Sequence, residues 1–304
     1  MRIVIALGGN ALMKRGEPQT MDVQRHNARI AAQAIASIAT GNELIVTHGN
    51  GPQIGLLALQ TSAPGVSPPY PLDILGAETD GMIGYVLQQE LVNALGEYRV
   101  ATLLTQIEVD PADPAFLQPT KFIGPLYEAA ESQRLAATLG WSVSRDGGNW
   151  RRVVPSPEPK GILEIGAIRT LVAAGFVTIC GGGGGIPVVR TASGRFEGIE
   201  CVVDKDFTSA LVAELLDADC LLMLTDVDAV YVDFGTPRAR EIRRAHRKEL
   251  EAFDFPAGSM GPKVEAARRF ARSGNRRACI GRLDDVQNIL AGSAGTTVVA
   301  DDNP

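Results

Sequence analysis

The sequence is poor in the residues that build metal centres and disulfide frameworks. It has three histidines and four cysteines in 304 residues, and the cysteines form no Cys-x-x-Cys pair. Metal-binding and disulfide-rich domains need such residues at short, regular spacings. We therefore expect no metal site, and reduced cysteines that lie mostly in or beside apolar runs. The residues concerned are His26, His48, His246, Cys180, Cys201, Cys220 and Cys279.

Long hydrophobic runs are also missing. No apolar run approaches the roughly 18 residues of a membrane helix, and the first run, Ile3–Leu7, is too short for a signal peptide. The net charge of −6 argues against binding to nucleic acid. The segment Arg238–Arg282 is locally basic, which we interpret as solvated faces of helices. These features predict a cytoplasmic protein with no membrane or nucleic-acid partner.

The common nucleotide-binding signatures are absent as well. No GxxxxGK[ST] loop occurs, and the glycine pairs Gly49/Gly51 and Gly183/Gly185 lack the third glycine of GxGxxG. The HRD and DFG motifs of protein kinases are missing too. A nucleotide, if one is bound, must be held by a different fold.

What the chain does contain is an alternation of short apolar runs with longer segments of helical periodicity. Apolar strands separated by helices predict an α/β fold with a mainly parallel sheet covered on both faces. The expected strands are Ile3–Leu7, Leu44–Thr47, Val100–Thr105, Phe176–Cys180, Leu221–Thr225, Ala278–Ile280 and Thr297–Val299. The expected helices include Val23–Ala39, Ile74–Leu95, Ile162–Ala174, Thr208–Leu216 and Val264–Ala271.

One region interrupts this alternation. Asp110–Pro159 is rich in proline, has weak periodicity and contains both tryptophans, Trp141 and Trp150. Nearly fifty such residues inside a regular α/β chain predict an inserted lobe or lid.

Three expected strands run directly into glycine-rich turns. The first precedes Gly8, Gly9 and Asn10, and the second precedes Gly49, Asn50 and Gly51. A third precedes five consecutive glycines, residues 181–185, which include Gly183 and Gly184. Ligands of such sheets lie beyond the carboxyl ends of the strands, where backbone N–H groups can surround an anion. The three turns therefore predict one shared phosphate-binding site.

Two lysines lie at positions in the sequence that suit the binding of a phosphoryl group. Lys205 stands between Asp204 and Asp206 after an apolar strand, where a helix begins. Lys263 follows Gly261-Pro262 at the start of another helix, whose positive end offers an unpaired lysine no stabilisation. Both positions favour an anionic ligand, although a surface charge cluster is the plainer alternative for Lys205.

The sequence offers no persuasive general base. An acceptor that is already an anion, such as a carboxylate or carbamate, needs no proton removed, but it needs cations to offset the approach of two anions. The segment 224–231 ends a strand with Thr225, Asp226 and Val227 and continues to Tyr231. It is either a polar turn or a contact to the ribose or base of a nucleotide.

Together these motifs resemble the amino acid kinase superfamily and, within it, the carbamate kinase family. The resemblance covers nearly the whole chain. It rests on ALGGNAL (6–12), VTHGNGPQIGLLALQ (46–60), GMIGY (81–85), TKFIGP (120–125), RRVVPSPEP (151–159), GGGGIPV (182–188), VVDKD (202–206), LTDVDAVYV (224–232) and GSMGPKVEAA (258–267). Phe122 and Glu78-Thr79-Asp80 depart from what many relatives carry at those positions.

The resemblance implies a fold and an activity. The fold is a single three-layer α/β/α sandwich over 1–304, with a protruding subdomain at about 111–155 and a nucleotide-binding half at about 196–304. The activity is reversible phosphoryl transfer between ATP and carbamate, giving ADP and carbamoyl phosphate, in arginine and carbamoyl phosphate catabolism. The resemblance also implies a homodimer and Mg²⁺ carried on the ATP phosphates.

The resemblance further implies roles for individual residues. Lys205 and Lys263 neutralise the phosphoryl group, Asp206 organises the two lysines, and Lys121 reaches carbamoyl phosphate from the lobe. The residues implied to bind the acceptor and phosphoryl oxygens are Gly8, Gly9, Asn10, Gly49, Asn50, Gly51, Gly183 and Gly184. Those implied on the nucleotide side are Thr225, Asp226, Val227, Tyr231, Ser259, Met260 and Gly261.

Two other functions remain open at this point. Another member of the superfamily would phosphorylate an amino-acid carboxylate such as acetylglutamate, but the proline-rich lobe matches carbamate kinases. A non-catalytic nucleotide sensor would not need all three lysines together with the acceptor-side turns.

Overall fold

A computed structural model describes residues 1–13, 16–18, 20–62, 69–96, 99–256, 258–272, 274 and 276–301. Its centre is an eight-stranded sheet in the order β15-β17-β16-β12-β1-β2-β9-β3. All neighbouring pairs in this sheet are parallel except β16 and β17, which are antiparallel. The strands are β15 (Arg244–His246), β17 (Thr296–Val299), β16 (Arg277–Arg282), β12 (Cys220–Thr225), β1 (Arg2–Leu7), β2 (Glu43–His48), β9 (Val177–Ile179) and β3 (Val100–Thr102).

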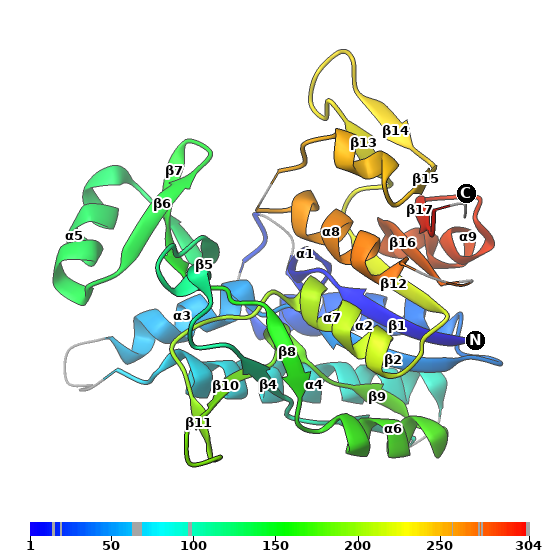
Figure 1. Cartoon of the computed structure of the whole chain (residues 1–304), viewed down its shortest axis with the longest axis horizontal. Coiled ribbons are helices and arrows are strands. Elements are labelled where there is room, and N and C mark those ends of the chain that lie inside the picture. Colours follow the sequence, from blue (N-terminus) through cyan, green and yellow to red (C-terminus); the bar gives the residue numbers. More distant parts are fainter. Residues whose placement is uncertain are drawn as a thin grey trace.

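Helices cover both faces of this sheet (Figure 1). In β1 successive side chains point to opposite faces: Ile3 and Ile5 join one core cluster, and Val4 and Ala6 join the other. The first cluster includes residues of α2 (Met21–Ala36), α4 (Leu72–Leu95) and α9 (Val286–Ala291). The second includes residues of α6 (Ile165–Ala173), α7 (Lys205–Leu215) and α8 (Met260–Phe270). This is the three-layer α/β/α sandwich with a mainly parallel sheet that was expected, and the prediction is confirmed.

Two smaller sheets flank the central one. A four-stranded sheet has the order β11 (Phe196–Gly198), β10 (Ile186–Arg190), β4 (Gln106–Val109) and β8 (Pro159–Ile162). A two-stranded hairpin joins β13 (Val230–Val232) and β14 (Arg240–Ile242). The strand expected at Val100–Thr105 is therefore shorter than predicted, because β3 ends at Thr102 and the chain then crosses to the four-stranded sheet.

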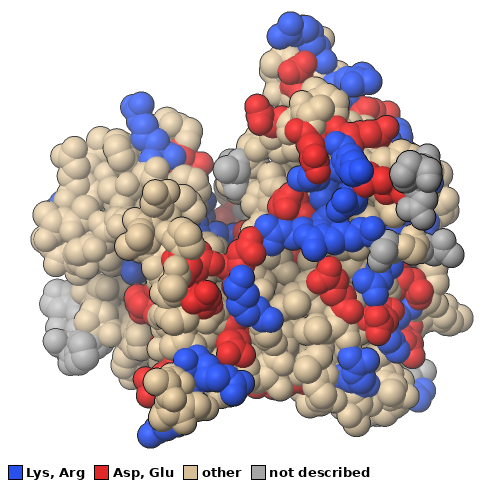
Figure 2. Space-filling model, viewed as in Figure 1, with Lys and Arg blue, Asp and Glu red and all other residues tan. Residues whose placement is uncertain are grey.

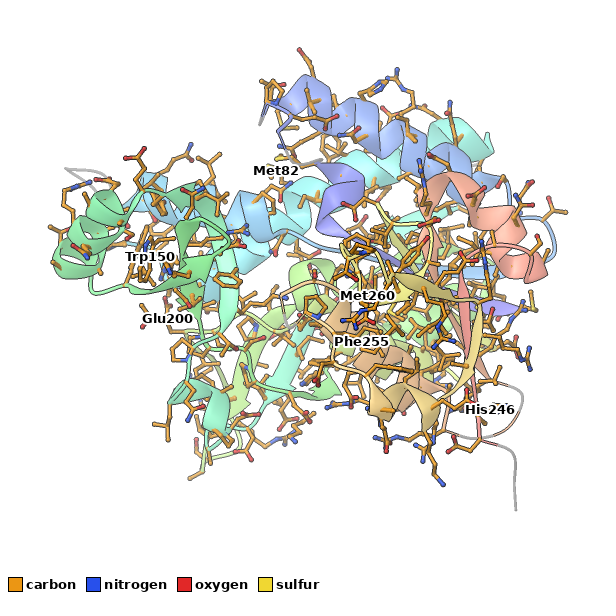
Figure 3. The ribbon with its side chains drawn as sticks, turned by 90° about the horizontal axis from the view of Figure 1, so that it is seen from above. Met82, Trp150, Glu200, His246, Phe255 and Met260 are labelled. Atoms are coloured by element: carbon orange, nitrogen blue, oxygen red, sulfur yellow. The ribbon has the colours of Figure 1, made fainter. Side chains whose placement is uncertain are left out.

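The proline-rich region forms a lobe that has its own sheet and helix. It contains a three-stranded sheet, β5 (Lys121–Tyr127), β7 (Asn149–Val154) and β6 (Ser142–Asp146), with α5 (Ala129–Leu139). Figure 1 shows this lobe standing away from the central sheet, and Figure 3 places Trp150 in it, far from Met260 at the start of α8.

The base of the lobe is joined to the main body by a small third core. Ile123 of β5 and Val154 of β7 are buried against Ile54 of α3 (Gly51–Thr61) and Leu72 of α4. Where β5 meets α3, Gly124 has a φ of +73°, and a Cβ on Gly55 would lie 1.9 Å from the Gly124 Cα. Two glycines are needed for this close approach of two backbones.

Charges are mixed over the surface that Figure 2 shows. On α8, Arg268 and Arg269 both pair with Glu265, so part of the basic segment is balanced locally. Other arginines of that segment, such as Arg240 and Arg244, lie on short strands rather than on helices, contrary to our interpretation. Within the described ranges, no helix combines the length and apolar character needed to cross a membrane.

Candidate active site

The three glycine turns come together at one edge of the central sheet. Their strands β1, β2 and β9 are neighbours and run parallel, so their carboxyl ends meet. Gly8 N–H donates to the Leu224 carbonyl of β12, and Gly49 N–H donates to the Leu7 carbonyl of β1. Gly9 and Asn10 begin the short helix α1 (Gly9–Leu12), and Asn50 and Gly51 begin α3. The predicted acceptor-side residues therefore share one location.

The run of five glycines lies packed against protein side chains. A Cβ on Gly182 would lie 1.9 Å from Asp80 Oδ1 and 2.5 Å from His48 Nε2. A Cβ on Gly183, whose φ is +69°, would lie 2.0 Å from Asn50 Nδ2, which itself donates to Thr79 Oγ1 at 2.7 Å. These glycines are thus required by close packing against α4 and the turn after β2, which the sequence pattern alone did not indicate.

Two lysines and one aspartate form the charged centre of the site. Lys205, in the first turn of α7, donates to Asp206 Oδ1 at 2.6 Å. Lys263, in the first turns of α8, donates to Asp206 Oδ2 at 3.0 Å. Lys205 and Asp206 expose only 7% and 4% of their surface, so water screens this unit weakly. The local sequence offered Lys263 no protein partner at its helix start, whereas the resemblance linked it to Asp206, with which it pairs.

Burial and charge act in opposite directions on these three groups. Burial alone would raise the pKa of Asp206, but Lys205 and Lys263 together hold it well below its usual range. Burial lowers the pKa of Lys205, an effect that Asp206 only partly offsets and Lys263 reinforces. Burial would also lower the pKa of Lys263, but Asp206 outweighs that effect and the pKa is raised. We take Asp206 as ionised between two cationic lysines, an excess of one positive charge suited to an anion.

The lobe contributes a third lysine. Lys121, the first residue of β5, donates to Asp204 Oδ2. Asp204 in turn caps α7, because its Oδ1 accepts from the Asp206 N–H at 2.8 Å. A Cβ on Gly258, just before α8, would lie 3.6 Å from the Phe122 ring. Lys121 and Phe122 therefore bring the lobe against the start of α7 and the loop before α8.

The residues predicted on the nucleotide side are divided between two segments. Thr225 is the last residue of β12, and Tyr231 of β13 donates its hydroxyl proton to Asp228 at 3.0 Å. Asp226 and Val227 lie between these two strands. Ser259 precedes α8, whose first residues are Met260 and Gly261.

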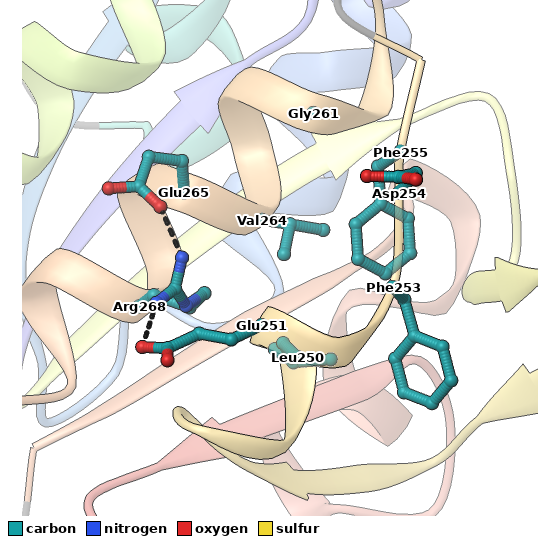
Figure 4. A pocket seen from close by; sticks show the side chains of 9 residues that line it. All are labelled: Leu250, Glu251, Phe253, Asp254, Phe255, Gly261, Val264, Glu265 and Arg268. Atoms are coloured by element: carbon teal, nitrogen blue, oxygen red, sulfur yellow. Dashed lines mark hydrogen bonds and ion pairs between the residues drawn. The ribbon is translucent and has the colours of Figure 1, made fainter.

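A pocket of about 260 Å³ lies on another face of α8 (Figure 4). It is lined by Leu250, Glu251, Phe253, Asp254, Phe255, Gly261, Val264, Glu265 and Arg268. Gly261 is the one predicted nucleotide-side residue in this lining. Arg268 spans the pocket with ion pairs to Glu251 and Glu265, so its charge is already balanced.

Three side chains of the site were not predicted to belong to it. Asp204 was named as a neighbour of Lys205 but not as the partner of Lys121. His48 and Asp80 are both fully buried under Gly182. The signal for His48 was its position at the end of a strand, directly before the Gly49 turn; nothing in the sequence marked Asp80 as its neighbour.

Comparisons with known proteins agree with this architecture. Residues 1–282 match the model of the amino acid kinase family. The chain is 53% identical over 299 residues to the carbamate kinase of Haemophilus influenzae, covering 98% of this chain and 96% of that protein. It is 44% identical over 311 residues to the carbamate kinase of Pyrococcus furiosus, covering 98% of this chain and 99% of that one.

Solved structures give the same result. The carbamate kinase of Giardia lamblia bound to AMP-PNP superposes with a TM-score of 0.89 at 39% identity, covering 99% of this chain and 98% of that one. The same enzyme bound to citric acid superposes with a TM-score of 0.92 at 39% identity, covering 99% of this chain and 98% of that one. UMP kinase from Bacillus anthracis shares the fold at 16% identity, with a TM-score of 0.56 and coverage of 99% and 96%.

Proposed function

Because this chain belongs to the amino acid kinase family, we propose that it transfers a phosphoryl group reversibly between ATP and carbamate, the reaction of a carbamate kinase. It is an ATP-dependent phosphotransferase. The observation that carries the mechanism is the unit of Lys205, Asp206 and Lys263 beside the meeting point of three glycine turns. One buried and one largely buried lysine on one carboxylate leave a positive charge where the phosphoryl group would pass.

The transfer that this site supports is direct and in line. In the ATP-forming direction, a β-phosphate oxygen of ADP attacks the phosphorus of carbamoyl phosphate. The bond from phosphorus to the carbamoyl oxygen breaks, and carbamate leaves as an anion. Neither partner needs to lose a proton, so Lys205 and Lys263 act only by offsetting negative charge in the transition state.

The two substrates would be held by different groups of residues near Asp206. Gly9, Asn50 and the other acceptor-side turns would hold carbamoyl phosphate, while Tyr231 and the start of α8 would hold the nucleotide. Mg²⁺ would enter with the nucleotide phosphates and belong to the substrate. Among the described residues, no cluster of three or more His, Cys, Asp or Glu could hold a metal.

The proposed function is tested by following ATP formation from ADP, Mg²⁺ and carbamoyl phosphate in a coupled assay. We expect rapid ATP formation, and no ADP formation from ATP when acetylglutamate replaces carbamate. A folded protein that binds ADP but forms no ATP would contradict the proposal. Activity with acetylglutamate would then identify a different acceptor, and inactivity with every acid would indicate a nucleotide sensor.

We expect Lys121 to interact with carbamoyl phosphate and not with the nucleotide. Changing Lys121→Ala removes the one charge that the lobe brings to Asp204. We expect kcat/KM for carbamoyl phosphate to fall by about 10²-fold, as for other lost transition-state donors. The KM for ADP should not change. Arg134→Ala, which breaks an exposed ion pair with Glu131 in the same lobe, is the matched control and should keep full activity.

We further propose that two copies of the chain associate through β3 and α4. β3 is one of the two edge strands of the central sheet, with backbone groups placed to pair with another strand. Beside it, Tyr85 of α4 and Leu104 are 56% and 51% exposed and line a hollow of about 550 Å³. Large apolar side chains next to an edge strand favour a second copy of the same surface, related by a two-fold axis.

The dimer is tested by light scattering after size-exclusion chromatography. We expect the wild type at twice the monomer mass of 32.2 kDa, and Leu104→Asp at the monomer mass, because a buried charge would oppose association. Leu117→Asp changes a leucine that is 87% exposed in the lobe segment and should stay dimeric. A monomeric wild type, or a dimeric Leu104→Asp, would contradict this interface.

The state of the cysteines bears on the cell compartment. All four cysteines are free and buried, which favours a reducing compartment, and we propose the cytoplasm. There the reversible reaction would belong to arginine and carbamoyl phosphate catabolism.

A further inference from the structure

The segment between β11 and α7 joins the lobe to the main body. Cys201 and Val203 are fully buried in the core cluster that α7 and α8 share. The alternate residues Glu200, Val202 and Asp204 contact the lobe instead. Because α7 begins directly after Asp204, this attachment lies next to the charged centre of the site.

The three contacts with the lobe differ in kind. Val202 packs in the small third core. Glu200 lies 3.8 Å from Arg152, too far for a hydrogen bond, and its side chain is 56% exposed. Asp204 accepts a hydrogen bond from Lys121, and the Asp204 side chain is only 8% exposed. Of the two charged contacts, the one with Lys121 is therefore screened less by water.

Both oxygens of Asp204 are used, each for a different element. Oδ1 accepts the Asp206 N–H at 2.8 Å and so caps α7, in whose first turn Lys205 lies. Oδ2 accepts from the Lys121 Nζ of β5. An N-cap side chain fixes the first turn of a helix, because it satisfies an N–H group that has no partner within the helix. One carboxylate thus places two lysines relative to each other.

Asp204 belongs to the main body, which is fixed at this point by the glycine run. A Cβ on Gly184 would lie 2.0 Å from the carbonyl oxygen of the buried Val203. The Thr208 hydroxyl of α7 donates to the Gly184 carbonyl at 2.8 Å, which ties the run to the helix. Lys121 belongs to the lobe. A displacement of the lobe would therefore move Lys121 away from a carboxylate that stays in place.

Lys121 can bind a ligand while Asp204 holds it. An ammonium group has three N–H donors, and Asp204 takes one of them. In the part of the chain that the structure describes, the Lys121 Nζ makes no other hydrogen bond, and the Lys121 side chain is 31% exposed. Two N–H groups are thus left for an anion near the start of α7.

We propose that Asp204 is a positioning residue for phosphoryl transfer, which holds Lys121 of the lobe at a fixed place beside the start of α7. This inference rests on the proposed carbamate kinase activity, in which Lys121 interacts with carbamoyl phosphate. Asp204 acts through Lys121 rather than on the substrate. The acceptor side of the site is complete only when this contact joins the lobe to the main body.

The kinetic test compares Asp204→Asn with the wild type in the ATP-forming assay. The amide oxygen can still accept the Asp206 N–H, and Asn caps helices as well as Asp does, so α7 keeps its cap. Lys205 and Lys263 keep their partner Asp206. We expect kcat/KM for carbamoyl phosphate to fall by about tenfold, because Lys121 loses a hydrogen bond to a charged group but stays in the lobe. The KM for ADP should keep its wild-type value.

A cycle of variants separates positioning from a purely structural role. If Asp204 acts through Lys121, Asp204→Asn should change kcat/KM by less than about twofold when Lys121→Ala is already present. Structural damage would instead lower kcat/KM by the same factor in both backgrounds, and that result would overturn the proposal.

Glu200→Gln is the matched control. It makes the same change from acid to amide in the same segment, and the amide oxygen can still accept the Leu72 N–H, which Glu200 accepts at 2.8 Å. It should keep wild-type kinetics, because its charged neighbour is Arg152 rather than a lysine of the site. If Asp204→Asn does not fold, Asp204→Ser gives the same test, because a serine hydroxyl caps a helix but cannot form an ion pair with Lys121.

The failure of this inference differs from the failure of the proposed function. Wild-type kcat/KM for carbamoyl phosphate in a folded Asp204→Asn enzyme would overturn the role of Asp204 and leave the proposed function standing. A wild type that forms no ATP from carbamoyl phosphate would refute the proposed function, and this inference with it.

Discussion

Lys205→Ala should slow ATP formation by 10²–10³-fold or more, the loss that follows removal of one preorganised donor to a transition state. The lysine is 7% exposed and held 2.6 Å from Asp206, so water cannot readily replace its charge. The loss should appear in kcat, because the negative charge of the phosphoryl group depends most on the lysine in the transition state, while the group moves from one substrate to the other. The KM for ADP should change little. Steady-state kinetics with ADP, Mg²⁺ and carbamoyl phosphate measure both constants.

The control for this variant is Lys160→Ala, which removes an exposed lysine on β8. It should turn over like the wild type. If Lys205→Ala also kept near wild-type kcat, Lys205 would have no part in the transfer, and the charge would have to be supplied by Lys263 and Lys121.

Asp206→Asn should affect stability as well as turnover. The change leaves the buried Lys205 and the largely buried Lys263 without the carboxylate that both contact. Removing one partner of a buried ion pair destabilises a protein by about 3–5 kcal/mol. We expect the free energy of unfolding to fall by an amount of this order at pH 7, measured by urea titration. Turnover should also fall at least as far as in Lys205→Ala, because both lysines lose their anchor.

The same variant gives a signed prediction for pH. The folded pKa of Asp206 is lowered, so its contribution to stability is present at neutral pH. It is lost as the pH falls below the unfolded value of about 4 towards the folded pKa. The difference in unfolding free energy between wild type and Asp206→Asn should therefore shrink in acid. Asp284→Asn, which alters an exposed pair with Arg282, should show neither effect. Equal stability of Asp206→Asn and wild type at pH 7 would contradict the account.

The sequence predicted the central sheet well because of the way its strands are buried. β1, β2 and β12 are covered on both faces, so each contains a continuous run of at least three apolar residues. The glycine turns were visible for the same reason, since each follows such a run. The end of β3 was not, because the run 100–105 stays largely apolar while the chain leaves one sheet for another.

Contacts between distant segments could not be predicted from local pattern. The local sequence around Lys263 gives no sign of its partner Asp206, which is 57 residues away and which only the resemblance named. The pairing of His48 with Asp80 depends on how α4 crosses the end of β2, which no motif encodes. The glycine run was interpreted as a phosphate cradle, but its lack of side chains is first a requirement of packing against His48, Asp80 and Asn50. The roles of the individual site residues stay predictions that the variants test.

The most direct test of the central claim is a rapid-quench single turnover with carbamoyl phosphate labelled in its phosphoryl group. The enzyme and MgADP are in excess, and ATP and protein-bound label are followed with time. We predict that label passes to ATP in one step with none on the protein, and that Lys205→Ala slows this step by at least about 10²-fold. Label that appears on the protein before ATP, or an unchanged rate in Lys205→Ala, would contradict direct transfer assisted by the lysines on Asp206.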